Sequence, residues 1–209
     1  MKTNIIIAAL LFAASSLFSQ TNLLIDGSFE LMPVGTKNFV VNNGGKITGK
    51  SGKWQVAFAK GGCEGGCCEG TAEITASAKK TGNNSLTLTI LRQTNRNDVK
   101  VLQSINAVPA GVYEISLWVK SDVADCPIAV DALMATQPNS NNGKDPFTGN
   151  FTTSTEWKQI KLKVDISAWT DEERNEMRVS IRPNNNKKLP EGPYPKIFWI
   201  DDVVFSAVK

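Results

Sequence analysis

The 209-residue chain carries 23 basic and 20 acidic side chains, which gives a net charge of +3, and it contains no histidine. The charges are spread along the chain without the basic stripe that nucleic-acid binding requires, which argues against a nucleic-acid partner. The missing histidine excludes Ser-His-Asp and Cys-His catalysis and removes the commonest ligand for zinc or copper. The composition therefore favours a binding protein over an enzyme.

The first twenty residues have the pattern of a secretory signal peptide. Lys2 precedes an apolar run from Ile5 to Phe12, and small and polar residues follow as far as Gln20. The run is too short to span a bilayer, which needs about 20 apolar residues, and no later stretch is longer. No cysteine lies near the cleavage region for lipid attachment. We therefore expect a secreted, periplasmic or cell-surface protein without a transmembrane segment, in which residues 21–209 form one domain.

Short runs of strand-forming residues follow the signal peptide, separated by clusters of Gly, Asn, Pro and Ser. They lie at 54–59, 72–76, 85–91, 99–105, 112–120, 128–134, 157–166, 177–182 and 197–205. A helix-like stretch at 167–176 and two long polar loops at 137–150 and 183–195 interrupt them. Short strands at this spacing predict an all-β fold, a jelly-roll β-sandwich of two antiparallel sheets.

Alternate residues of a β-strand point to opposite faces of its sheet. The apolar face of 112–120 comprises Tyr113, Ile115, Leu117 and Val119. Trp118 therefore falls on the polar face, and Arg178 and Arg182 fall opposite the apolar residues of their own strand. Such a face suits sugars, whose C–H surfaces stack on aromatic rings and whose hydroxyls bond to guanidinium groups. Packing of Trp118 under a neighbouring loop is the alternative.

Three of the four cysteines, Cys63, Cys67 and Cys68, fall in one glycine-rich segment, and the fourth is Cys126. In an exported protein an even number of cysteines indicates disulfides. Cys63 can pair with Cys67 or Cys68 because the glycines allow a tight turn, and the remaining cysteine can pair with Cys126. Spacing does not fix the connectivity. A thiolate metal site is the alternative, and it is disfavoured because its fourth ligand would be the distant Cys126.

Five sequence patterns occur in the order and spacing of a known family. They are 22–30 (NLLIDGSFE), 80–86 (KTGNNSL), Gln103 followed by 108–120 (VPAGVYEISLWVK), 157–160 (WKQI) and 198–203 (FWIDDV). Together they resemble the CenC-like carbohydrate-binding modules, families four, nine and twenty-two, within the galactose-binding-like jelly rolls. The resemblance covers nearly the whole mature chain, and it implies a jelly roll that binds a polysaccharide or an oligosaccharide.

The resemblance also implies a structural calcium ion where the first strand, the turn before an early strand and the last strand meet. Glu30 matches the carboxylate of the first strand and Asp201 that of the last. Backbone carbonyls near Ser28, Lys80 and Asn83 would complete a shell of the hard oxygen donors that calcium prefers. The alternative is that Glu30 and Asp201 cap strand ends or pair with Lys80. Without an ion, two carboxylates brought together should repel each other.

In these modules the sugar site lies on a concave sheet face or at the loop rim. The matching sheet positions are Gln103, Trp118, Arg178 and Arg182, and the loop candidates are Trp169 and Tyr194. The cysteine-rich segment 61–70 and the loop 137–150 depart from the family pattern and resemble insertions that could cover a groove. Trp54 and Trp199 are assigned to the core, because a tryptophan among apolar strand residues is more often packing than platform.

The sequence is compatible with three functions. The first and expected one is a non-catalytic glycan binder, assembled with other polysaccharide-utilisation proteins. The second is a structural or protein-interaction β-sandwich of the cell envelope with a degenerate sugar site, because a fold does not fix a function. The third is a glycosidase or lyase using carboxylates from 171–173 or from Asp201 and Asp202. It is disfavoured because adjacent carboxylates rarely flank a substrate. Exposure of Trp118 and the two arginines on one surface would favour the first.

Overall fold

The computed structural model describes residues 21–37, 40–42, 53–58, 68–94, 99–134, 147–185 and 193–208, with 40–42 described by their backbone. The strands of this part of the chain are β1 (Val40–Asn42), β2 (Gln55–Phe58), β3 (Cys68–Thr75), β4 (Ser85–Gln93), β5 (Val99–Ile105), β6 (Val112–Ser121), β7 (Pro127–Met134), β8 (Phe147–Thr152), β9 (Lys158–Asp165), β10 (Met177–Pro183) and β11 (Lys196–Ala207). The short helix α1 (Asp171–Asn175) lies between β9 and β10. The predicted signal peptide, 1–20, lies outside the described residues.

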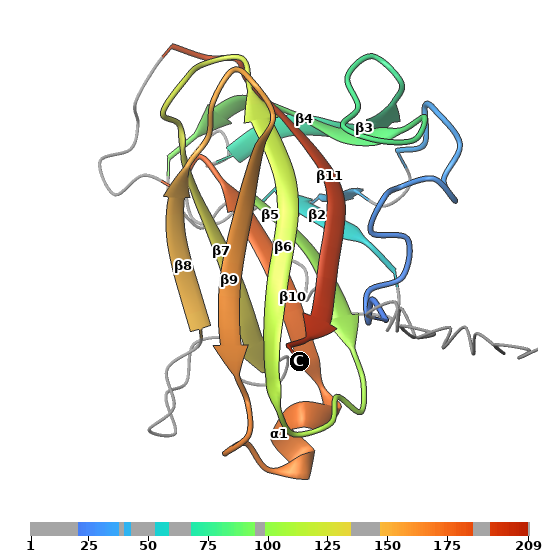
Figure 1. The fold of residues 1–209 in the computed structure, drawn as a ribbon. Helices are drawn as coiled ribbons and strands as arrows, with labels where there is room; N and C mark the ends of the chain where they lie inside the picture. Colours follow the sequence, from blue (N-terminus) through green and yellow to red (C-terminus); the bar gives the residue numbers. More distant parts are fainter. Residues whose placement is uncertain are drawn as a thin grey trace, which may run out of the picture.

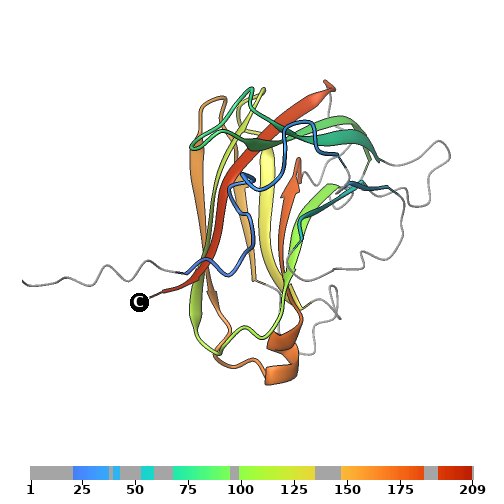
Figure 2. The same ribbon diagram turned by 90° about the vertical axis from the view of Figure 1, so that its right-hand side faces the viewer.

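The strands form two sheets that pack face to face (Figure 1, and edge-on in Figure 2). Sheet A has the strand order β1-β2-β5-β10-β7-β8, and sheet B has the order β3-β4-β11-β6-β9. Hydrogen-bonded neighbours are antiparallel except β1 and β2, which run parallel. The predicted jelly-roll β-sandwich is therefore confirmed, and the parallel β1–β2 pair is its one departure from purely antiparallel sheets in the described ranges.

The core fills the space between the sheets and is formed by alternate residues of the strands. The apolar face predicted for β6 is buried, as are Val179 and Ile181 of β10. We call the row of each strand that points into this core its inner row, and the opposite row its outer row. Burying the inner rows of both sheets provides the main stabilisation of a sandwich of this kind.

Two strands were absent from the prediction, β1 and β8. The predicted loop 137–150 was wrong at its end, because β8 begins at Phe147 and pairs antiparallel with β7. The adjacent Gly149 and Asn150 lie between its two phenylalanines, and these turn-forming residues obscured the strand pattern. Phe147 and Phe151 nevertheless pack against the core. Residues 135–146 lie outside the described part of the chain.

The helix-like stretch 167–176 contains α1, whose first turn is fixed by a capping box. Thr170 Oγ1 accepts the backbone N–H of Glu173 at 3.3 Å, and the Glu173 carboxylate accepts the N–H of Thr170 at 2.7 Å. Nowhere in the described ranges is a helix long and apolar enough to cross a bilayer.

The segment that precedes β1 is held against the last strand, β11. The N–H of Leu23 donates to the carbonyl of Phe205, and the N–H of Val203 donates to the carbonyl of Gly27, both at 2.8 Å. A Cβ atom at Gly27 would lie 1.9 Å from the carbonyl oxygen of Val203, so only glycine permits this approach. The docking brings Glu30 to the turn before β4.

Candidate functional site

The tryptophan and the arginines predicted to share one sugar site lie on opposite outer faces of the sandwich. Trp118 is in the outer row of β6, in sheet B, whereas Arg178 and Arg182 are in the outer row of β10, in sheet A. The buried core separates them. The predicted site therefore divides into two candidate surfaces, the sheet A outer face and the sheet B outer face.

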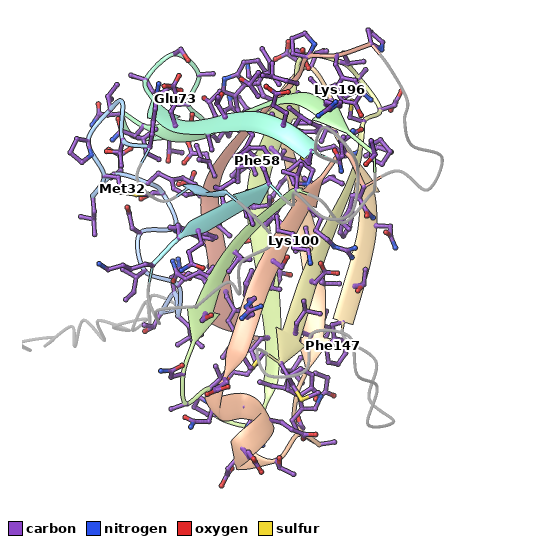
Figure 3. All side chains as sticks on the ribbon, turned by 180° about the vertical axis from the view of Figure 1, so that it is seen from behind. Met32, Phe58, Glu73, Lys100, Phe147 and Lys196 are labelled. Atoms are coloured by element: carbon purple, nitrogen blue, oxygen red, sulfur yellow. The ribbon has the colours of Figure 1, made fainter. Side chains whose placement is uncertain are left out.

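The sheet A outer face, which is toward the viewer in Figure 3, is formed by mainly polar side chains of five neighbouring strands. By strand alternation its members are Gln55 and Ala57 of β2, Lys100, Leu102 and Ser104 of β5, Arg178, Ser180 and Arg182 of β10, Ala129, Asp131 and Leu133 of β7, and Thr148 and Asn150 of β8. None of these side chains is aromatic. This face therefore offers hydrogen bonds and charge, but no ring on which a sugar could stack.

Among the described residues, Ser104 Oγ, Ser180 Oγ and Arg178 Nε of this face are buried without a hydrogen-bond partner. Arg178 lies directly opposite Ser104 in the β10–β5 register, and Ser180 is the next outer residue of β10. The two serines are 5% and 1% exposed. An unsatisfied buried polar group costs about 1–3 kcal/mol, and native structures contain few of them. Three on one face indicate groups placed for a ligand.

The neighbouring Arg182 is already paired. Its Nε and Nη2 each lie 2.7 Å from an oxygen of Asp131, whose side chain is 1% exposed. Thr148 Oγ1 donates to the same carboxylate at 2.8 Å, and Arg182 Nη1 donates to Asn185 Oδ1 at 3.4 Å. This bidentate pair fixes the guanidinium of Arg182 in one orientation. Arg182 is therefore part of the predicted face, but Asp131 occupies one edge of its guanidinium.

On the sheet B outer face, lysines cover the tryptophan rings. The ammonium of Lys80 lies 4.1 Å from the ring centroid of Trp118. The ammonium of Lys120 lies 4.8 Å from the ring of Trp199 and 5.8 Å from the ring of Trp157. These distances are in the range of cation–π attraction. A sugar that stacked on the lysine-covered faces of these rings would displace the lysines.

The assignment of both remaining strand tryptophans to the core was half correct. Trp54 is buried at 5% exposure, and its ring lies 5.4 Å from that of Phe29. Trp199 was wrongly assigned, because it lies in the outer row of β11 and is only partly buried. Its neighbours Phe198 and Ile200 take the inner positions.

Gln103 does not reach the sheet A outer face. It lies in the inner row of β5 and is fully buried. Its Oε1 accepts the N–H of Ile25 at 2.7 Å, and its Nε2 donates to the carbonyl of Ile25 at 2.8 Å. Its amide thus imitates a strand partner for the N-terminal segment, and the structure gives it a structural role.

The two loop candidates also lie away from that face. Trp169 is buried at 6% exposure, and its ring centroid is 6.1 Å from that of Phe147. The hydroxyl of Tyr194 accepts Nδ2 of Asn184 at 3.2 Å and donates to the carbonyl of Gln93 at 3.3 Å. Trp169 therefore packs as a core residue, and Tyr194 belongs to a polar network between β4 and β11.

Glu30 holds the turn before β4. Its Oε1 accepts the backbone N–H groups of Asn83 and Asn84 at 2.7 and 2.8 Å, and its Oε2 accepts Nδ2 of Asn83 at 3.4 Å. These donors, first that of Asn84, lower the pKa of the Glu30 carboxyl. A Cβ atom at Gly82 would lie 2.3 Å from Oε1 and would displace the Glu30 carboxylate, and the φ of +58° at this position also favours glycine.

Asp201 holds the other end of the same turn. Its Oδ2 accepts the N–H groups of Lys80 and Thr81 at 2.8 and 3.3 Å, and its Oδ1 accepts the N–H of Asp202 at 2.8 Å. Burial raises the pKa of the Asp201 carboxyl, and these three N–H groups counteract that shift. The predicted pairing with Lys80 thus uses its backbone N–H, while its ammonium lies over Trp118.

Two carboxylate oxygens, Glu30 Oε2 and Asp201 Oδ1, each have a lone pair that could bind a cation. A carboxylate oxygen has two lone pairs. The N–H donors use both at Glu30 Oε1 and Asp201 Oδ2, but only one at Glu30 Oε2 and Asp201 Oδ1. The described residues hold no group of three or more Cys, Asp or Glu side chains suited to a metal, so an ion would also need backbone carbonyls. The calcium ion stays a prediction.

Cys126 carries a free thiol that is 4% exposed. Burial is the main cause that raises its pKa, so the thiol stays protonated at neutral pH. Cys126 forms no disulfide in the structure, so its predicted pairing is not found there. Cys63 and Cys67 lie outside the described residues, and a disulfide of Cys63 with Cys67 or Cys68 stays a prediction.

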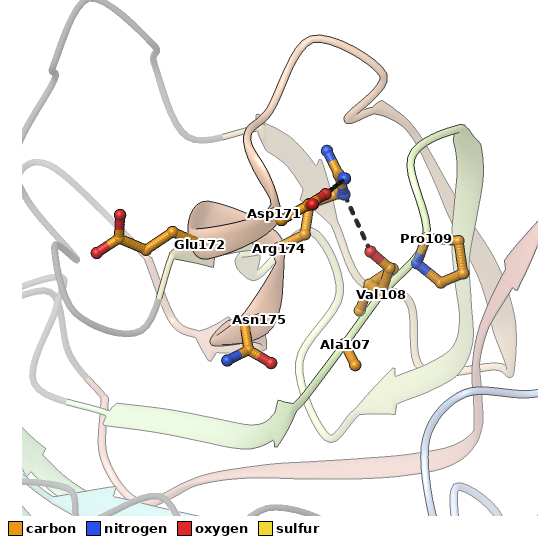
Figure 4. A pocket seen from close by; sticks show the side chains of 7 residues that line it. All are labelled: Ala107, Val108, Pro109, Asp171, Glu172, Arg174 and Asn175. Carbon is orange, nitrogen blue, oxygen red and sulfur yellow. Dashed lines mark hydrogen bonds and ion pairs between the residues drawn. The ribbon is translucent and has the colours of Figure 1, made fainter.

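The acidic run 171–173 lies on α1, at one end of the sandwich, beside a pocket of about 490 Å³ (Figure 4). The pocket is lined by Ala107, Val108, Pro109, Asp171, Glu172, Arg174 and Asn175. Arg174 donates to the carbonyl of Val108 at 3.1 Å and pairs with Asp171. Glu172 points away from them in Figure 4. Asp171 and Glu172 therefore do not form the paired carboxylates that glycoside hydrolysis needs.

Comparison with known proteins assigns the fold to a family. Over residues 22–186 the sequence matches a family model described as a carbohydrate binding domain, in the group of modules four and nine. The chain belongs to this carbohydrate-binding family. The resemblance found in the sequence is thereby confirmed. No curated protein matches the sequence.

Solved structures of carbohydrate-binding modules share the sandwich of this family member. A protein from Bacteroides thetaiotaomicron described as sugar binding gives a TM-score of 0.60 at 15% identity, covering 90% of this chain and 100% of its own. A CBM4 module gives 0.52 at 19% identity, covering 73% and 85%. TmCBM61, solved with β-1,4-galactotriose, gives 0.53 at 15% identity, covering 90% and 99%. At these identities the likeness establishes the fold alone.

Proposed function

We propose that the protein is a secreted, non-catalytic carbohydrate-binding protein that takes a polysaccharide or oligosaccharide on the sheet A outer face. The observation that carries the proposal is the set of buried, unpartnered atoms Ser104 Oγ, Ser180 Oγ and Arg178 Nε. Sugar hydroxyls both donate and accept hydrogen bonds, so they can satisfy two serine hydroxyls and an N–H group together. Membership of a carbohydrate-binding family supports the same ligand class.

The chemistry of the face supports binding without catalysis. Its one described carboxylate is Asp131, which is paired with Arg182. Glycoside hydrolysis needs two carboxylates on opposite sides of the scissile bond, one of them able to give up a proton. The described part of the face does not provide that pair. Its rigid polar groups instead favour recognition, because groups held in place lose little entropy when a ligand binds.

The double variant Ser104→Ala and Ser180→Ala tests this site. We expect binding on a glycan array or affinity gel to fall by about tenfold or more, because each lost hydrogen bond is worth about 0.5–1.5 kcal/mol. The melting temperature should not fall, since neither hydroxyl has a partner in the free protein. Ser116→Ala, in the outer row of β6, is the matched control. Unchanged binding in the double variant would move the site elsewhere, and no binding of any polysaccharide by the folded wild type would refute the function.

One observation favours a second candidate, a structural or protein-interaction sandwich of the cell envelope. Trp118, Trp157 and Trp199 gather on the sheet B outer face, away from the arginines, and lysines cover them. Tryptophan side chains are enriched at protein–protein interfaces, so these rings also suit a protein partner. If Trp118→Ala abolished sugar binding while the serine double variant kept it, the sugar site would lie on sheet B.

The proposal includes export and assembly. An N-terminal signal peptide over 1–20 is expected to be removed, which the mass of the mature protein from cell fractions will show. Family members of this kind commonly act outside the cytoplasm, so association with other polysaccharide-utilisation proteins at the cell surface is the expected setting. Co-purification from the envelope fraction would test it, and retention of the intact precursor in the cytoplasm would contradict the export step.

A further inference from the structure

Arg178 is a cation without a counter-ion. Its Nε is buried and unpartnered, and no salt bridge or hydrogen bond of this guanidinium occurs among the described residues. Burial lowers its pKa, and the charge of Glu176 raises it, but Glu176 forms no ion pair with it. The guanidinium nevertheless stays charged at physiological pH. The sandwich therefore holds a partly buried positive charge that no described side chain of the same face neutralises.

Arg182, on the same strand and the same face, is an arginine whose charge is paired with a carboxylate. Asp131 accepts two of its N–H groups at 2.7 Å each. The sequence thus provides a carboxylate for Arg182, while Arg178 has Ser104 opposite it on β5 and Leu133 opposite it on β7. A planar guanidinium matches a carboxylate or a sulfate through paired hydrogen bonds. The missing partner of Arg178 is therefore an anion of that shape.

The surroundings of Arg178 favour a charged sugar over a neutral one. Neutral sugars gain much of their affinity by stacking on aromatic rings, and no described side chain of the sheet A outer face is aromatic. Ser104 and Ser180 offer unpartnered hydroxyls next to the guanidinium. The face therefore combines a cation for an acidic group with hydroxyls for the oxygens beside it.

We propose that the sheet A outer face binds an acidic saccharide, with Arg178 pairing to its carboxylate or sulfate and Ser104 and Ser180 bonding to adjacent hydroxyls. This inference rests on the proposed function and names the class of sugar. The carboxylate of a uronic acid and a sulfate ester share the required geometry and charge, and the two sources are separated by the ligands used in the test.

The test measures retardation in affinity gels containing paired polymers. Polygalacturonate is compared with its methyl ester, and dextran sulfate with dextran, so that each pair differs only in the anionic group. Wild type should bind one or both acidic members and neither neutral one. Arg178→Gln should weaken that binding by about 10- to 100-fold, because a hydrogen bond to a charged group contributes about 1.5–3 kcal/mol. Arg178→Lys should restore only part, since an ammonium cannot form the paired contact.

The control Lys163→Gln removes the same charge from β9 in sheet B and should leave binding unchanged. Equal losses in Arg178→Gln and Lys163→Gln would mean that net charge alone attracts the polymer, and would overturn the proposal. Binding of a neutral polymer that survives in Arg178→Gln would also overturn it, while leaving sugar binding intact. Absence of binding to acidic and neutral polymers alike would refute the proposed function itself. Melting curves will show that Arg178→Gln stays folded.

Discussion

Replacing Arg182 by methionine should destabilise the protein by about 3–5 kcal/mol, the usual cost of breaking a buried ion pair from one side. The structure sets this magnitude. Asp131 is 1% exposed, and Arg182 supplies two of its contacts at 2.7 Å. In the variant only Thr148 continues to donate to the carboxylate among the described contacts. In a domain of this size each kcal/mol shifts the melting temperature by roughly 2–4 °C, so a fall of roughly 6–20 °C is expected.

The double variant Asp131→Leu and Arg182→Met should recover most of that loss, because an apolar pair of similar volume replaces both charges. Urea titrations of the wild type, the singles and the double measure the free energies of unfolding and yield the coupling energy of the pair. Lys161→Met is the control. It breaks an ion pair with Glu114 whose side chains are 55% and 36% exposed, and it should cost less than about 1 kcal/mol. A cost below about 1 kcal/mol for Arg182→Met, or a double variant as unstable as the single, would refute this view of the pair.

Three further predictions concern Glu30, the predicted calcium ion and Cys126. The folded protein lowers the pKa of Glu30. The melting-temperature advantage of wild type over Glu30→Gln should therefore be full above pH 4.5, the unperturbed pKa, and disappear as the pH falls through the lower folded pKa. A difference in melting temperature that does not change with pH would contradict this. If a calcium ion binds between Glu30 and Asp201, EDTA should lower the melting temperature, because the two carboxylates then lose their shared cation. An unchanged melting temperature, together with no metal by elemental analysis, would rule out that ion. Iodoacetamide should label Cys126 slowly in the native protein and quickly in urea, since burial keeps the thiol protonated. Rapid labelling of the native protein, or a disulfide at Cys126 in peptide mapping, would contradict a buried, free thiol.

Strand alternation predicted the faces of individual strands well, because period two is a local property of the backbone. Trp118 and Arg178 were both correctly placed outward. The alternation could not show that their strands belong to different sheets, since sheet membership depends on pairing between distant segments. A single mixed site of tryptophan and arginine was the consequence.

Two errors could have been avoided from the same periodicity. Gln103 shares its parity with Val99, Val101 and Ile105, which places it in the inner row of β5. Trp199 alternates with Phe198 and Ile200, which places it outward. Gln103 was assigned from the family resemblance and Trp199 from its residue type, and both were given more weight than position in the strand. Position was the better guide.

The unpartnered atoms of Ser104, Arg178 and Ser180 required the structure, because only the three-dimensional contacts show which buried polar groups lack a partner. A sequence that specifies one fold normally satisfies its buried polar groups, and natural proteins break that rule mainly where function requires it. The two arginines of β10 differ in this respect. Arg182 has its carboxylate, and Arg178, four residues away on the same face, does not. The fold stabilises the first arginine internally, and no carboxylate among the described residues does the same for the second.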